Sequence, residues 1–98
     1  MSTPCIITAK EKPTLAIYIH YDGDDIQMVK DIVDIAIKNE ARNPNYDEAY
    51  GMARLVCACQ EYFQNKTTGF GIFAYKKSHS YGENYHYTID AAWNVEEV

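Results

Sequence analysis

Two helical patterns stand next to each other in the middle of the chain, and short strand patterns flank them on both sides. Because strands do not alternate with helices, this order argues against a parallel α/β fold. It predicts a two-layer α+β domain, in which two hairpins form an antiparallel sheet of four or five strands with both helices on one face. The expected elements are strands at 5–9, 15–21, 70–75, 85–89 and 93–95, and helices at 26–38 and 48–64.

The two helices are predicted from capping residues and apolar spacing. Asp25 and Asp47 precede the apolar patterns and can cap the helix N-termini with their carboxylates. Gly51 lies inside the second pattern and costs about 1 kcal/mol relative to Ala, so we expect it to let another backbone segment or a ring approach closely. The apolar stripes expected to face the core are Ile26, Val29, Val33, Ala36 and Ile37 in the first helix, and Ala49, Met52, Ala53, Val56, Cys59 and Phe63 in the second.

The length and composition predict a single domain that spans residues 1–98. The chain has 98 residues, of which 47% are apolar and 23% charged, as in ordinary globular domains. No signal-peptide pattern or apolar run of about 18 residues occurs, so we expect a cytoplasmic protein without membrane contact. Cys5, Cys57 and Cys59 lack metal-binding spacing and are interpreted as small core residues in a reducing compartment.

The charge of the chain restricts its partners. The formal net charge is −5, and only Arg42 and Arg54 are arginines. The lysines are scattered and form no basic stripe, so the sequence predicts no direct contact with nucleic acid. An acidic protein of this kind is expected to meet a basic surface of another protein.

The segment at 17–23 contains the residues closest to a catalytic pattern. Tyr18, His20 and Asp22 are spaced two apart, so they should lie side by side on the face of the strand away from the core. A His next to a carboxylate can serve as a general base or a metal ligand. The same residues are also ordinary for a strand that ends in an Asp-Gly turn, and the sequence favours this structural interpretation.

Metal binding is considered at two places and favoured at neither. Asp22, Asp24 and Asp25 lack the later ligands of a calcium loop and are better explained by turn formation and helix capping. His20, His79 and His86 could meet Asp22 at a transition metal, but nothing in their spacing forces them together. The sequence therefore predicts no metal site, no cofactor and no catalytic centre.

The sheet face away from the helices is expected to be rich in rings. Alternation along the strands places Tyr18 and His20 there, then either Phe73 and Tyr75 or their alternates on the third strand, and His86 with Thr88 on the last. An exposed aromatic face of this size is typical of a partner site or a homodimer interface. The alternative is that the long loops fold over it.

Several motifs resemble those of a family of small bacteriophage and prophage accessory proteins. They are Thr3-Pro4-Cys5-Ile6-Ile7-Thr8, the segment Ile17-Tyr18-Ile19-His20-Tyr21-Asp22-Gly23, and Tyr50-Gly51-Met52-Ala53-Arg54-Leu55 before Tyr62-Phe63. The chain departs from the family where Tyr21 replaces a frequent Trp and Asp24-Asp25 replaces a turn with Gly or Pro, which leaves the partner open. The resemblance implies an accessory gene of a mobile element whose product acts in the cytosol of a bacterial host. This class includes inhibitors of host defence such as anti-CRISPR proteins.

Three functions follow as hypotheses, and a homodimer is compatible with each. The first is an inhibitor, not an enzyme, that occupies a basic surface of a host defence protein such as a CRISPR effector. The second is a binder of a small nucleotide signal, in which rings such as those of Tyr18 and Tyr87 stack on the base and Arg54 or a lysine meets the phosphate. The third, least favoured, is a metal-dependent enzyme centred on His20 and Asp22. The predicted binding residues are Tyr18, His20, Tyr21, Asp22, Asp24, Asp25, Arg54 and Tyr87.

Overall fold

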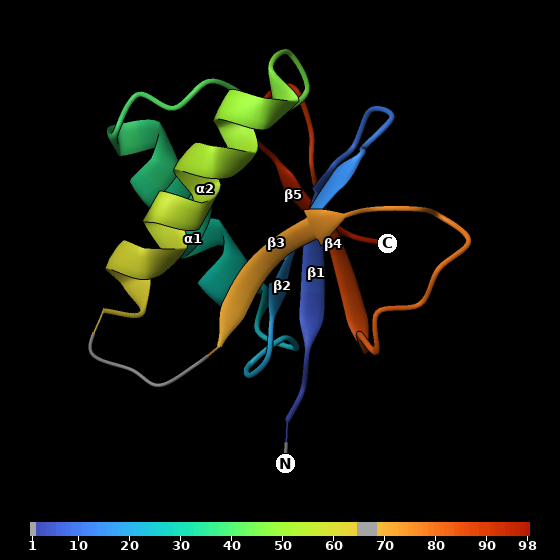
Figure 1. Ribbon diagram of the computed structural model, residues 1–98. Helices are drawn as coiled ribbons and strands as arrows, with labels where there is room; N and C mark the ends of the chain where they lie inside the picture. Colours follow the sequence, from blue (N-terminus) through green and yellow to red (C-terminus); the bar gives the residue numbers. More distant parts are fainter. Residues whose placement is uncertain (1, 65–68) are drawn as a thin grey trace.

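Short runs of β-branched and aromatic residues form the strands, and the two helical patterns form a layer of helices on one face of the sheet (Figure 1). The computed structural model describes residues 2–64 and 69–98. The predicted polar turn before the third strand lies mostly outside these residues. The elements are β1 (Cys5–Ala9), β2 (Leu15–Ile19), α1 (Ile26–Lys38), α2 (Glu48–Tyr62), β3 (Phe70–Ala74), β4 (Tyr85–Ile89) and β5 (Val95–Glu97).

The α+β class and the order of the elements are confirmed, but the sheet is mixed. The strand order is β3-β2-β1-β4-β5, and β1 pairs with β4 in parallel, while the other neighbours pair antiparallel. The predicted hairpin between β3 and β4 is therefore wrong. Because β3 pairs antiparallel with β2, it runs in the direction of β1 and β4, so the loop at 75–84 must carry the chain back across the sheet.

Both helices begin where their caps predict. Asp25 Oδ1 accepts hydrogen bonds from the backbone N–H groups of Gln27 and Met28, at 3.0 and 3.3 Å. Asp47 caps α2 by accepting from the N–H of Tyr50 at 3.4 Å. Among the helices of the described residues, none is long and apolar enough to cross a membrane.

The buried face of α2 is rotated from the predicted one. Ala49 and Ala53 are exposed, whereas Leu55 and Ala58 are buried. Small residues occur on both sides of this helix, so hydrophobicity alone does not select a face. Gly51 selects it, because the segment at 42–44 packs directly on its Cα. In α1, Ile37 is exposed and Ile26 is only partly buried, whereas Met28 and Ile32 are buried with the predicted Val29, Val33 and Ala36.

The core lies between the helices and one face of the sheet. From the sheet, the core takes Cys5, Ile7, Ile17, Ile19, Tyr87 and Ile89. Cys5 and Cys59 are buried as predicted, and burial raises the pKa of each thiol to about 12. Cys57 is exposed, which corrects its assignment to the core.

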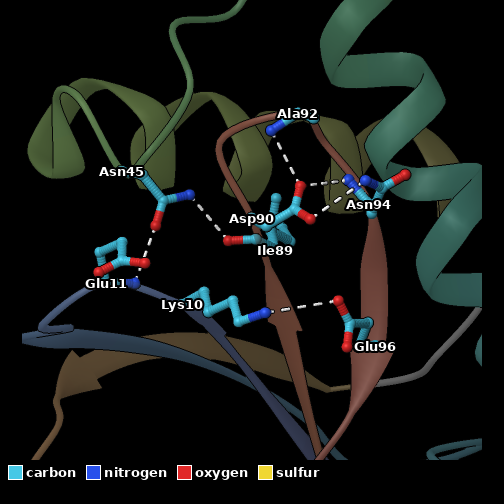
Figure 2. A network of polar contacts seen from close by, with 8 residues as sticks. All are labelled: Lys10, Glu11, Asn45, Ile89, Asp90, Ala92, Asn94 and Glu96. Carbon is cyan, nitrogen blue, oxygen red and sulfur yellow. Dashed lines mark hydrogen bonds and ion pairs between the residues drawn. The ribbon is translucent and has the colours of Figure 1, made fainter.

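The side-chain amide of Asn45 holds the turn between β1 and β2 against the end of β4 (Figure 2). Asn45 donates from Nδ2 to the carbonyl of Ile89 at 2.8 Å and accepts from the N–H of Glu11 at 2.9 Å. The carboxylate of Glu48, at the start of α2, accepts from the N–H groups of Thr14 and Leu15 at 2.7 and 3.0 Å. The turn at 10–14 is thus fixed from two sides.

Candidate functional site

A row of aromatic rings crosses the sheet face opposite the helices. The ring centroids are 4.7 Å apart for Tyr21 and His20, 6.0 Å for His20 and Tyr18, 6.3 Å for Tyr18 and Phe73, and 4.4 Å for Phe73 and Tyr81. Such separations are those at which aromatic side chains attract one another. We call these five residues the aromatic row. Tyr18 and His20 were predicted on this face, and Phe73 was one of two alternatives for it. Tyr81 was not predicted there, and Tyr21 was expected on the core side of the strand, whereas it is 42% exposed.

The 75–84 loop covers part of the face, as the alternative interpretation suggests. Tyr81 packs on Phe73, and its hydroxyl donates to the carbonyl of Ala74 at 3.0 Å and accepts from the N–H of Lys76 at 2.7 Å. Under the rings and the loop, Ile6 and Ala16 are fully buried although they point away from the helices. At the other end of the row Tyr21 remains 42% exposed, so this end is free to meet a partner.

His20 pairs with a tyrosine. A hydrogen bond of 3.0 Å joins its Nδ1 to the hydroxyl of Tyr18. Asp22 has a φ of 61°, which turns the chain after β2, and in the described part of the chain no hydrogen bond links it to His20. The predicted His20–Asp22 pair is therefore not formed, because the turn takes the carboxylate out of the alternation of the strand.

An acidic turn, consisting of Asp22, Asp24 and Asp25, follows the aromatic row. All three residues are exposed. Burial raises the pKa of the Tyr62 phenol, and the nearby carboxylates of Asp31, Asp25 and Asp22 raise it further. Negative charge therefore gathers around the N-terminal end of α1. Of the three aspartates in the turn, Asp25 has its carboxylate engaged in the helix cap.

Two predicted binding residues lie away from this surface. Arg54 is exposed on α2, in the layer of helices, whereas Tyr18 lies on the opposite face of the sheet. Tyr87 is 1% exposed and donates from its hydroxyl to the carbonyl of Gly23 at 2.6 Å. Burial raises the pKa of Tyr87 to about 12. Stacking of a nucleotide between Tyr18 and Tyr87, with Arg54 on its phosphate, is thus excluded by the fold.

His86 lies on the same sheet face as the row. Its Nε2 is 2.8 Å from Oγ1 of the fully buried Thr8, and its ring is 5.6 Å from that of Tyr75. Burial lowers the pKa of His86, while the Glu83 carboxylate acts in the opposite sense. Within residues 2–64 and 69–98, no group of three or more His, Cys, Asp or Glu side chains is placed to hold a metal ion.

The lowered pKa of His86 predicts a loss of stability in mild acid. Since the imidazole binds its proton less readily in the folded chain, its contribution is complete above about pH 6.5 and is lost as the pH falls through the folded pKa. Urea unfolding between pH 8 and pH 5 should show a smaller loss for His86→Gln than for the wild type. The exposed His79→Gln should follow the wild type. Equal pH profiles for His86→Gln and the wild type would contradict this role.

A groove of about 390 Å³ opens on the same face beyond His86. Its lining includes Thr8, His86 and Tyr75, together with the cationic side chains of Lys10, Lys12 and Lys77. The sequence did not indicate this group, because its lysines come from two loops that are far apart in the chain. The composition of the chain does not indicate a basic group either, because the overall charge is negative.

Comparison of the chain with protein-family models, with curated proteins and with solved structures finds no match. The likeness to phage accessory proteins therefore stays a prediction from the motifs. Function has to be inferred from two surfaces of the molecule, the aromatic row with its acidic turn and the lysine groove.

Proposed function

We propose that the protein is a phage-type accessory protein that acts by binding, and that it inhibits a host defence system by occupying a basic surface of one of its proteins. The observation that supports this function best is the continuity of the aromatic row with the acidic turn. Tyr21, at the exposed end of the row, is followed directly by Asp22, and Asp24 lies two residues further on. Rings and carboxylates are thus presented together at one edge.

This combination suits a partner surface rich in arginine. A guanidinium group can pair with a carboxylate through two hydrogen bonds and can also stack on an aromatic ring. Tyrosine is enriched at protein interfaces because its ring is apolar and its hydroxyl can still bind water or a partner. Proteins that bind nucleic acid carry such basic surfaces, and a CRISPR effector is one example of them. By covering such a surface, the acidic chain would compete with the nucleic acid.

The residues of the surface have different roles in this proposal. The hydrogen bond between Tyr18 and His20 fixes both side chains before a partner binds, which lowers the entropic cost of association. Tyr21 supplies an exposed ring, and Asp22 and Asp24 supply charge. Asp25 contributes charge while it caps α1. A homodimer is compatible with this arrangement.

The proposal is tested by neutralising the acidic turn. Asp22→Asn/Asp24→Asn removes two charges and keeps the fold, because Asn tolerates the positive φ at position 22. In a bacterium with an active CRISPR system, the wild-type protein should restore plaque formation by a targeted phage, and the variant should not. Capture of the basic partner from the lysate should weaken about tenfold or more with the variant.

A control variant distinguishes surface charge from net charge. Asp34→Asn/Glu40→Gln makes the same change of two charges at exposed positions on α1 and just after it, so it should protect the phage like the wild type. Loss of protection in both variants would show that only net charge matters. The proposal fails if the wild-type protein neither protects the phage nor retains a partner.

A further inference from the structure

The lysine groove lies at the opposite end of the sheet face from the acidic turn. Cys5 pairs with Ile19 in the register of β1 and β2, so the turn after Ile19 lies at one end of these strands, and the turn at 10–14 lies at the other. Lys10 and Lys12 come from the turn at 10–14, and Lys77 comes from the loop after β3. A second function can therefore occupy this end independently of the partner surface.

The groove is lined by cationic side chains, although the chain as a whole is acidic. The protein has a net charge of −5, yet three of its nine Lys and Arg residues line this one groove. Lys10 forms an ion pair with Glu96 at 3.6 Å, in which both side chains are about half exposed (Figure 2). Exposed pairs of this kind contribute little free energy, so an anionic ligand can displace the Glu96 carboxylate from Lys10.

The cationic side of the groove is built on a fixed backbone. Glu48 and Asn45 hold the 10–14 turn through hydrogen bonds to the N–H groups of Thr14, Leu15 and Glu11. Lys10 and Lys12 therefore start from defined backbone positions. A fixed turn lowers the entropy that a ligand must remove on binding.

The other side of the groove is aromatic and polar. The rings of Tyr75 and His86 lie 5.6 Å apart, and the hydroxyl-bearing side chains of Thr8 and Thr88 lie beside them in the lining. A planar base can stack on such rings. The volume of about 390 Å³ lies within the usual range for small-molecule sites, about 300–1,000 Å³.

We propose that this groove binds a mononucleotide, with its phosphate held by Lys10, Lys12 and Lys77 and its base against Tyr75 and His86. The lysines supply the charge-assisted hydrogen bonds that a phosphate accepts. A small ligand fits better than a nucleic acid strand, because the acidic turn at the far end of the face repels a polyanion that extends along it. This site differs in place and in residues from the one expected at Tyr18, Tyr87 and Arg54.

The test is calorimetric titration of the full chain with AMP, adenosine and inorganic phosphate. AMP should bind with one molecule per chain, and more tightly than either of its parts. Lys12→Gln/Lys77→Gln should weaken AMP binding about tenfold or more, since each lysine donates a charge-assisted hydrogen bond. Glu96→Gln should strengthen binding, because it removes the carboxylate that competes for Lys10. A merely destabilised protein would not bind more tightly.

Lys30→Gln/Lys38→Gln is the matched control. It removes two exposed lysines of α1, outside the lining of the groove, and should leave the affinity for AMP unchanged. The proposal is overturned if AMP does not bind, if the groove variant binds AMP as the wild type does, or if inorganic phosphate or a short single-stranded oligonucleotide binds more tightly than AMP. Capture of a protein partner should be unaffected by the groove variant. A negative result for the groove would therefore not count against the proposed partner surface.

Discussion

Gly23→Ala is expected to lower the free energy of unfolding by about 3 kcal/mol. A Cβ at this position would collide with the carbonyl oxygen of Thr3 and would lie 2.7 Å from the backbone N of Cys5 and the carbonyl C of Pro4. Backbone atoms of a buried segment cannot move aside cheaply. The N–H of Gly23 also donates to Thr3 at 2.6 Å, and its carbonyl accepts from Tyr87, so a shift of the turn would break both hydrogen bonds.

Chemical denaturation followed by circular dichroism measures this effect. Gly71→Ala is the control, because a Cβ at position 71, in the exposed strand β3, would meet nothing within 4 Å. That variant should stay within about 0.5 kcal/mol of the wild type. Equal stability of Gly23→Ala and Gly71→Ala would show that the close contact with 3–5 does not hold the acidic turn in place.

Gly51→Ala is expected to destabilise the protein by about 2 kcal/mol, although helix propensity alone predicts a gain of about 1 kcal/mol. The new Cβ would lie 2.6 Å from the N and Cα of Pro44 and 2.7 Å from the carbonyl oxygen of Arg42. Because these are backbone atoms of the connection between the helices, α2 would have to move away from it. The packing term therefore outweighs the propensity term.

The reverse change at an exposed position of the same helix separates the two terms. Ala53→Gly should destabilise by about 1 kcal/mol, which is the propensity difference without a packing contribution. Both variants are then less stable than the wild type, although one adds a methyl group to α2 and the other removes one. A more stable Gly51→Ala protein would contradict the close approach of 42–44.

Local patterns were enough to predict the elements of the fold, but not the pairing of β1 with β4. Asp25 and Asp47 mark where the helices begin, and the predicted bounds of β1 and β4 agree with the observed ones. The direction of β4 depends on the 75–84 loop, whose polar sequence is compatible with a hairpin or a crossover. Non-local pairing of this kind leaves no periodic signal in a short strand.

The residues of the candidate site were predicted only in part, because some of their positions also depend on how distant segments of the chain pack. Alternation along the strands correctly placed Tyr18 and His20 on the face away from the helices, but it did not decide between Phe73 and its neighbours on β3. The same alternation puts Tyr87 on the core face, opposite to His86, so its assignment as a binding residue conflicted with the strand pattern. Tyr81 was missed because its position depends on how the loop returns across the sheet.

The most direct test of the proposed binding surface is hydrogen–deuterium exchange of the protein with and without its captured basic partner. The aromatic row and the acidic turn predict slower exchange at 20–24 in the complex, with no change along the exposed side of α1 at 34–40. Protection confined to the helices, with unchanged exchange at 20–24, would contradict the assignment of this edge as the partner site.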